Sequence, residues 1–204
     1  MTNRDELSAS AKHKSIEAAA REKNPLEKLP VRCDTYKSNT SEEFKLYCRA
    51  KGDMDAKTLK WTFKLAEQNV GPYYKQLKMG WKPKIKQAEL NKNWARFLVA
   101  LNQQNQPVAY TMFRFDMDNG DCVLYCYEIQ ISPEYRRKGL GKFMMETLEL
   151  CARFWQLEKI MLTVLNNNED SLMFFKTLGY ATDETSPDVL EEADYQILSK
   201  SMLG

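Results

Sequence analysis

The sequence predicts an α/β domain built on one mixed, mostly antiparallel β-sheet. Strand and helix patterns follow one another in the order strand, helix, three strands, helix, strand, helix, strand. The three consecutive strands are joined by short turns, which makes them an antiparallel meander. A long helical pattern separates the third of these strands from the next one. We therefore expect that pair to run parallel through a right-handed crossover.

Composition limits the classes of protein to which the chain can belong. Its 204 residues, 43% of them apolar, suffice for one well-packed domain with an added N-terminal element. A net charge of +2 gives no electrostatic reason to expect nucleic acid as a partner. No stretch approaches the length of a membrane span, and the N-terminus has no signal-peptide core. These features lead us to expect a soluble, intracellular protein.

The cysteine and histidine content argues against metal and thiol chemistry. The five cysteines form no CxxC pair and lie mostly within apolar runs, which favours reduced, buried thiols. The only histidine, His13, lies near the N-terminus. Neither a Cys/His zinc site nor a nucleophile activated by histidine can therefore be assembled from the body of the chain.

Residues 1–40 are predicted to form a helical arm and a connector, and residues 41–204 the main domain. Residues 1–24 are mostly polar with a thin apolar stripe, and this helical pattern ends before Asn24-Pro25. Two interpretations of the arm stay open: a solvated or partly disordered helix, and a helix that packs on the domain. Residues 25–39 show no clear period and should connect the arm to the domain over the surface.

The first half of the main domain is predicted to contain a strand, a helix and two further strands. Residues 43–49 alternate apolar and charged side chains, as in a strand with one buried face. From Asp55 apolar residues recur every three or four positions, until Gly71-Pro72 is expected to end the helix. Residues 73–81 are aromatic and lysine-rich without a period, and they fit either a cleft rim or a core anchor. The two strands follow at 96–101 and 108–115.

The second half continues the sheet. The turn signal Asp118-Asn119-Gly120-Asp121 leads into an apolar, aromatic strand at residues 122–131. The strand that we expect to lie parallel to it is the buried segment 159–165. The remaining elements are a helix at 140–156, a helix at 169–178 ended by Gly179, and a strand at 195–200.

A basic turn with two glycines lies between the strand at 122–131 and the helix that follows it. Its sequence is Arg136-Arg137-Lys138-Gly139-Leu140-Gly141-Lys142. A turn that begins a helix presents unpaired backbone N–H groups and the positive end of the helix dipole, and glycines let an anion approach the main chain. The turn lacks the frame of a nucleotide-hydrolysing P-loop and the further glycine of a dinucleotide fingerprint. It therefore predicts a phosphate-binding loop of another kind.

Two motifs carry a resemblance to a known family. The Arg-x-x-Gly-x-Gly pattern of residues 136–141 resembles the pyrophosphate loop of acyl-CoA-dependent N-acetyltransferases of the GNAT type. Asn168-x-x-Ser171-x-x-Phe174-Phe175, followed by Gly179-Tyr180, is similar to the second motif of these enzymes. The resemblance implies the GNAT fold with a bulged central strand, acetyl-CoA as the donor, and no metal. The cofactor-binding residues that it implies are Ile129, Gln130, Ile131, Arg136, Arg137, Lys138, Gly139, Leu140, Gly141, Lys142, Asn168 and Phe174.

Further segments look like the NatD-type N-alpha-acetyltransferases. They are residues 113–116, 123–128, 136–143, 161–164 and 195–199. This resemblance implies acetylation of the α-amine of core histones whose tails begin Ser-Gly-Arg-Gly. It also implies a monomer without an auxiliary subunit, histone tail peptides as partners, no direct nucleic-acid or membrane contact, and a location in the nucleus and cytoplasm.

Glu128 is the candidate general base, with Tyr127 beside it as the second catalytic residue. An α-amine has an unperturbed pKa of about 8, so its deprotonation costs about 3 kcal/mol less than that of lysine, and a carboxylate suffices. An edge carboxylate facing solvent or paired with an arginine is the alternative. Strict alternation would place Tyr125 and Tyr127 on the face opposite Glu128. The resemblance implies a bulge in this strand, which would remove the conflict, and we predict it near residues 128–130, where its freed amides would bind the thioester oxygen.

The substrate end of the cleft is predicted from the resemblance and from one pair of aspartates. Asp116 and Asp118 share a face at the end of a strand, where they would suit an arginine at the third position of the tail. Capping of the Asn119-Gly120 turn is the alternative. The chain differs from the family at Met79, where the family has tryptophan, and at Asp118, where it has glutamate. The implied substrate-binding residues are Tyr74, Trp81, Asp116, Asp118, Tyr125, Tyr127, Thr163 and Tyr195.

Two other functions remain open from the sequence. The first is a GNAT enzyme that acetylates a lysine side chain or a small amine. The second is a non-enzymatic module whose basic loop binds an acidic partner or RNA. Only an enzyme would bind acetyl-CoA, and only an N-alpha-acetyltransferase would prefer the Ser-Gly-Arg-Gly terminus.

Overall fold

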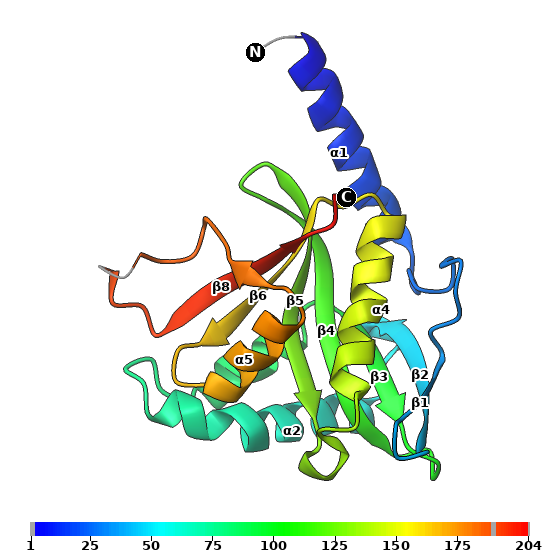
Figure 1. The fold of residues 1–204 in the computed structure, drawn as a ribbon, viewed down its shortest axis with the longest axis vertical. Helices are drawn as coiled ribbons and strands as arrows, with labels where there is room; N and C mark the ends of the chain where they lie inside the picture. The colour runs from blue at the N-terminus through cyan, green and yellow to red at the C-terminus, as the bar shows by residue number, and fades with distance from the viewer. Residues whose placement is uncertain (1–2, 189–190, 204) are drawn as a thin grey trace.

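The computed structural model describes residues 3–188 and 191–203, and its centre is one β-sheet (Figure 1). Within these residues the sheet has eight strands in the order β1-β2-β3-β4-β5-β6-β8-β7. All neighbours are antiparallel except β5 and β6, which are parallel. The predicted mixed, mostly antiparallel sheet and its crossover are confirmed. The strands are β1 (Thr35–Lys37), β2 (Glu43–Ala50), β3 (Arg96–Leu101), β4 (Pro107–Asp118), β5 (Asp121–Ile131), β6 (Lys159–Leu165), β7 (Ala181–Thr182) and β8 (Tyr195–Ser201).

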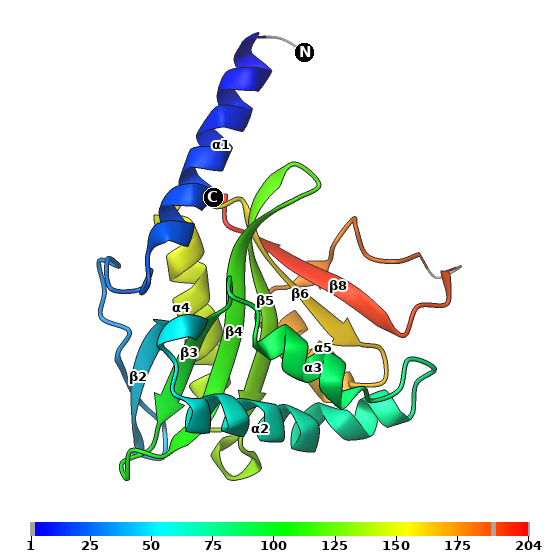
Figure 2. The same ribbon diagram turned by 180° about the vertical axis from the view of Figure 1, so that it is seen from behind.

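Helices cover both faces of the sheet (Figures 1 and 2). On one face the core is built by buried residues such as Met144 and Phe113, and on the other by Leu65 and Tyr110. Each large apolar side chain buried in this way contributes about 1.5–3 kcal/mol to stability. No helix in the described ranges is long and apolar enough to cross a membrane. The first face carries α1 (Asn3–Arg21), α4 (Leu140–Phe154) and α5 (Glu169–Thr177), and the second α2 (Ala56–Lys75) and α3 (Pro83–Leu90).

Besides the two-residue strand β7, which the sequence analysis does not predict, three features differ from the sequence-based expectations. α2 continues past Gly71-Pro72 to Lys75, so Pro72 lies inside the helix, three residues before its end, where its ring leaves one backbone bond unmade. α3 has no counterpart in the prediction, since only Lys86 and Leu90 of its eight residues are buried and no apolar period is visible. β1 lies inside the predicted connector, and its three residues are too few to show alternation.

The C-terminal turns of α1 pack on the domain. Ala19 is fully buried in the core and Ile16 packs against it. Arg96 donates a hydrogen bond to the carbonyl of Glu22 just beyond the helix, at 2.9 Å from Nη2 to O. The structure thus agrees with the second interpretation of the arm. The domain boundary at residue 41 stays a prediction, although the sheet already begins at Thr35.

β5 contains a bulge in its second half. On β4, Met112 pairs with Glu128, but the next residue, Phe113, pairs with Cys126, so Tyr127 is the extra residue on β5. The predicted bulge is therefore present, one residue earlier than predicted. β5 pairs with β6 only as far as Cys126, and beyond the bulge the two strands separate (Figure 2). The C-terminal half of β5 is consequently unpaired on its β6 side.

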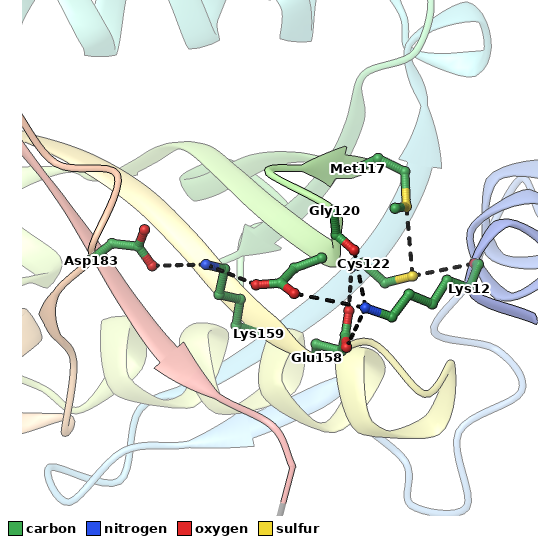
Figure 3. A network of polar contacts seen from close by, with 8 residues as sticks. Lys12, Met117, Gly120, Cys122, Glu158, Lys159 and Asp183 are labelled. Atoms are coloured by element: carbon green, nitrogen blue, oxygen red, sulfur yellow. Dashed lines mark hydrogen bonds and ion pairs between the residues drawn. The ribbon is translucent and has the colours of Figure 1, made fainter. Parts of the chain in front are cut away.

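A chain of ion pairs at the other end of β5 ties distant segments together (Figure 3). Asp183, just after β7, pairs with Lys159 of β6 at 3.1 Å, and Lys159 pairs with Asp121 of β5 at 3.2 Å. Lys12 of α1 pairs with the same Asp121 at 3.8 Å and with Glu158 at 2.8 Å. Charges of opposite sign therefore alternate from the C-terminal edge of the sheet to the N-terminal helix.

Substituting Asp183, at one end of this row of ion pairs, tests how much the ion pairs contribute to stability. Asp183→Ala should lower the free energy of unfolding by about 1–2 kcal/mol at pH 7, because the buried Lys159 would lose one of its carboxylate partners while keeping Asp121 at 3.2 Å. Burial opposes the charge on Asp183, but hydrogen bonds from Ser199 and Thr185 and the contact with Lys159 hold its pKa below the usual range. Because the pKa of Asp183 is lower in the folded than in the unfolded chain, its stabilising contribution is present above about pH 4. That contribution is lost as the pH falls below this value. In urea denaturation, the difference in free energy of unfolding between the wild type and Asp183→Ala should therefore shrink in acid.

The control for this prediction is Glu184→Ala, at the neighbouring exposed position. It should change the free energy of unfolding by no more than about 0.5 kcal/mol. Equal losses in the two variants would contradict the role given to Asp183.

Candidate active site

Two adjoining hollows run along the C-terminal half of β5, where it separates from β6. The first, here called the loop hollow, lies between α2, the residues 129–142 and α5. The second, the tyrosine hollow, lies between α2, α3 and the β5–β6 pair. Both are lined by Val70, Ile129, Gln130, Asn168, Ser171 and Phe175. The shared lining shows that the two hollows meet at the bulge.

The loop hollow gathers most of the residues predicted to hold a cofactor. Those that line it are Ile129, Gln130, Ile131, Arg136, Arg137, Gly139, Gly141, Lys142, Asn168 and Phe174. Two predicted residues have side chains elsewhere. Lys138 pairs with Glu42 at 2.6 Å, and Leu140 is buried in the core. Their side chains therefore do not line this hollow, although their backbone N–H groups belong to the same loop.

The backbone of the loop is suited to an anion. Gly139 is the N-cap of α4 with φ of +82°, and the first intrahelical bond runs from Phe143 N to Gly139 O at 3.0 Å. The N–H groups of residues 140–142 therefore precede the helical ladder and have no partner within the helix. A Cβ on Gly139 would collide with the hydroxyl of Tyr36, and one on Gly141 would lie 2.9 Å from Ile131 Cδ1. Gly139 is thus favoured as glycine by both its positive φ and the close approach of Tyr36, while a larger residue at position 141 would require Ile131 to shift. The amides with the helix dipole can hold a phosphate.

Aromatic side chains form the wall of the tyrosine hollow. The rings of Tyr125 and Tyr127 lie 4.8 Å apart, and Trp94 lies 4.9 Å from Tyr127. Burial raises the pKa of Tyr125 to about 12, although its 2.6 Å contact with the Thr163 hydroxyl lowers it. Burial also raises the pKa of Tyr127. Both phenols therefore stay protonated at neutral pH and can donate hydrogen bonds, but neither is a base there.

Glu128 lines the tyrosine hollow directly before the shared residues Ile129 and Gln130, and it is only 6% exposed. Its Oε1 accepts from Lys86 Nζ at 2.5 Å and its Oε2 from Gln130 Nε2 at 2.6 Å. Lys86 also pairs with Glu89 at 2.6 Å. Burial opposes the charge on Lys86, but the two carboxylates outweigh it and raise the lysine pKa. Glu128 is therefore neither a solvent-facing carboxylate nor an arginine partner, because its counter-charge is a buried lysine.

A short chain of amides connects the two hollows. Asn69 of α2 donates from Nδ2 to Gln130 Oε1 and to the carbonyl of Ile131, both at 3.1 Å. Gln130 in turn donates to Glu128. The sequence analysis does not single out Asn69, Lys86 or Glu89. The available signal was the Lys86–Glu89 spacing of three residues within a proline-initiated helix.

The predicted substrate-binding residues divide into two groups. Tyr74, Tyr125, Tyr127 and Thr163 line the tyrosine hollow. Trp81 and Tyr195 do not line it: Trp81 packs against Phe63 and donates from Nε1 to Glu67 at 3.1 Å. Tyr195 instead pairs with Leu165 at the start of β8.

The two aspartates predicted to bind the tail also lie outside the hollow. Asp116 forms an ion pair with Arg114 on the same strand and accepts from Met117 N at 3.0 Å. Arg114 lies over the ring of Trp94, 4.8 Å from its centroid. Asp118 stands opposite Asp121 in the last pair of the hairpin. Asp116 is thus engaged by Arg114 rather than by the Asn119-Gly120 turn.

The site does not include a recognisable metal centre. Over residues 3–188 and 191–203, no group of three or more His, Cys, Asp or Glu side chains is arranged to hold a metal ion. The loop hollow offers backbone amides and the basic side chains of Arg136, Arg137 and Lys142. The tyrosine hollow offers neutral phenols and the charged side chains of Lys86, Glu89 and Glu128.

Comparison with known proteins relates this geometry to a family. The model of the acetyltransferase (GNAT) family matches residues 59–180, more than half of the chain. Among curated proteins, N-alpha-acetyltransferase 50 of Danio rerio is 29% identical over 93 residues, which are 44% of this chain and 55% of that protein. The chain thus spans about half the length of this relative.

Solved structures show the same fold. Arabidopsis thaliana NAA60, in complex with a bisubstrate analogue, matches 77% of this chain and 98% of its own with a TM-score of 0.55 and 9% identity. The PaiA N-acetyltransferase of Thermoplasma acidophilum, in complex with coenzyme A, matches 77% of this chain and 99% of its own with a TM-score of 0.53 and 13% identity. At these identities the likeness concerns the fold alone.

The close approach at Gly139 can be tested with a pair of substitutions. Gly139→Ala should lower the free energy of unfolding by at least about 1–2 kcal/mol, because its positive φ is strained for alanine and its Cβ meets the Tyr36 hydroxyl. Adding Tyr36→Phe removes that hydroxyl and should restore part of the loss. Thermal denaturation of both single variants and the double variant measures the coupling. Strictly additive effects would contradict the proposed contact.

Proposed function

The chain belongs to the acetyltransferase (GNAT) family, and from this premise we propose that it transfers the acetyl group of acetyl-CoA to an N-terminal α-amine. The acceptor that we propose is a core histone tail beginning Ser-Gly-Arg-Gly. The observation that carries the proposal is the bulge at Tyr127, which brings Tyr127 and Glu128 to the junction of an anion-binding hollow and an aromatic hollow. The relative named N-alpha-acetyltransferase 50 supports the choice of an α-amine.

The loop hollow fits the donor. The free amides of residues 140–142 and the two glycines suit a pyrophosphate approached from the main chain. Arg136 is partly engaged, since its Nε donates to the Ile131 carbonyl at 3.1 Å, so the backbone is the main ligand. When bound, acetyl-CoA supplies an acetyl thioester whose carbonyl carbon forms the new C–N bond as the C–S bond breaks, leaving the coenzyme as a thiol.

Glu128 is the proposed general base. Its carboxylate lies at the junction of the hollows and has no hydrogen of its own to donate, so it can accept the proton that the amine loses. An α-amine with an unperturbed pKa of about 8 is partly neutral at physiological pH, so the base need not be strong. Tyr127 lies beside Glu128 as a neutral phenol, and its role is to donate a hydrogen bond within the site.

The tyrosine hollow is the proposed entrance for the tail. Tyr74, Tyr125 and Thr163 line this hollow. We propose that it receives the small first residues of the tail, Ser-Gly. Asp116 and Asp118 are proposed to bind the arginine at the third position. In the structure Asp116 is paired with Arg114, so the tail arginine would have to replace or share that contact.

The remaining proposals concern the partners, the oligomeric state and the location of the enzyme. We propose that histone tail peptides are the partners and that the enzyme acts as a monomer without an auxiliary subunit. We further propose that it is located in the nucleus and cytoplasm, where histones are made and assembled. The resemblance described above supports these proposals.

A panel of acceptors tests the proposed function. Ser-Gly-Arg-Gly peptides should be acetylated with a higher kcat/KM than the same peptide with a blocked N-terminus and an internal lysine, or than spermine. A Ser-Gly-Ala-Gly peptide should lose about tenfold or more in kcat/KM, because charge-assisted hydrogen bonds to the arginine would be missing. Faster acetylation of spermine or of the lysine peptide would instead identify a GNAT enzyme of another specificity.

The second test concerns the base. Glu128→Gln should lower kcat by about 10²–10⁴-fold, because the amide cannot accept the proton. The affinity for acetyl-CoA, measured by calorimetry, should change little, since Glu128 lines the tyrosine hollow and not the loop hollow. Glu134→Gln, an exposed position beyond the same strand, is the matched control. Undiminished turnover would remove Glu128 as the base, and a wild-type protein that fails to bind acetyl-CoA would favour the non-enzymatic module.

A further inference from the structure

We infer that Lys86 is a positioning residue for the proposed reaction: it holds Glu128 as an ionised, fixed carboxylate at the junction of the two hollows and thereby sets the lower pH limit of turnover. The inference rests on the proposed function, since it concerns the proposed base. It assigns a role to α3, an element that carries no motif in the sequence.

The contacts of Lys86 place its ammonium group between two carboxylates. Its Nζ lies 2.5 Å from Glu128 Oε1 and 2.6 Å from Glu89 Oε2. The same ammonium lies 5.8 Å from the centroid of the Tyr74 ring. Gln130 donates to the other oxygen of Glu128 at 2.6 Å. Both oxygens of the proposed base are therefore held, one by a charge and one by a neutral amide.

Stability alone does not account for a lysine at this position. Lys86 is 8% exposed, and a charged side chain is costly to bury. Buried ion pairs can often be replaced by apolar side chains without loss of stability. α3 already has an apolar anchor in Leu90, which is 1% exposed. A charge retained beside the proposed base is better explained by an effect on that base.

The titratable groups around Glu128 show what the lysine does. Glu89 and Lys86 face it from α3, Tyr74 from α2, Tyr110 from β4, and Cys126 from β5 itself. Burial raises the pKa values of Tyr74, Tyr110 and Cys126, so these three groups are neutral at pH 7. Only Lys86 and the carboxylates remain charged.

Without Lys86, the site would hold two carboxylates with no cation between them. Burial and a neighbouring like charge both favour the protonated form of a carboxyl group. A protonated Glu128 cannot accept the amine proton, so turnover would be lost first at low pH. With Lys86 present, the trio of Lys86, Glu128 and Glu89 carries one net negative charge, which also attracts a positively charged α-amine.

The test is the pH dependence of kcat/KM for the full-length chain with acetyl-CoA and a Ser-Gly-Arg-Gly peptide. Lys86→Met should move the acid limb up by about one unit or more, so that kcat/KM falls by about tenfold or more on the acid side of the profile, with a smaller loss at pH 7 and the smallest at pH 9. Lys86→Arg keeps the charge and should retain the wild-type acid limb. Lys84→Met, on the exposed side of the same helix, should match the wild type at every pH.

A second variant keeps the test decisive if Lys86→Met fails to fold. Glu89→Gln removes the like charge and leaves Lys86 to Glu128 alone, so its acid limb should stay in place or move down. An upward shift in Glu89→Gln would overturn the inference. So would a loss in Lys86→Met that is the same at all pH values, since a merely structural role would produce it.

Glu128→Gln separates this inference from the proposed function. If Glu128→Gln keeps full turnover, the proposed base is wrong and the inference fails with it. If Glu128→Gln loses turnover but Lys86→Met keeps the wild-type acid limb, only the inference fails. In the Glu128→Gln background, Lys86→Met should cause no further shift of the acid limb, and a further shift would show that Lys86 acts on another group.

Discussion

The extra residue in β5 is the constraint on which the candidate site depends. Because Tyr127 has no partner on β4, the side chains of Tyr127 and Glu128 reach the same face, although they are adjacent in the sequence. The same irregularity coincides with the end of the β5–β6 pairing at Cys126. An unbroken strand would continue to pair with β6 and close the space that the two hollows share. The glycine loop and the tyrosines depend on that opening.

The two hollows bind by different physical means. The loop hollow offers backbone amides and a helix dipole, which depend on the path of the chain through Gly139 and Gly141. The tyrosine hollow offers side chains, so its selectivity can change by substitution without altering the loop. Lys86 and its two carboxylates line the tyrosine hollow, and Glu128 is hydrogen-bonded to Gln130, which both hollows share. Their position at the junction is why we assign them to proton transfer.

Sequence reasoning succeeded where a signal is local. The order of strands, the parallel pair, the glycine loop and the bulge each depend on a short stretch of chain or on the connection between two stretches. It failed at α3, at β1 and at the end of α2, where charged, very short or proline-containing segments acquire structure by packing on the sheet. The assignments of Trp81 and Asp116 to the substrate site stay predictions. What the sequence did not indicate is that Trp81 contacts Glu67 and that Asp116 contacts Arg114.

The sequence by itself determined that the chain forms a mixed sheet with an anion-binding turn before its long helix, because periodicity and glycine placement act within a few residues. Only the tertiary structure decided which side chains meet. Lys86 and Glu128 are 42 positions apart, and their ion pair exists because α3 packs over the bulge. The physical reason is that burial and charge pairing depend on distances in space, which no local pattern encodes.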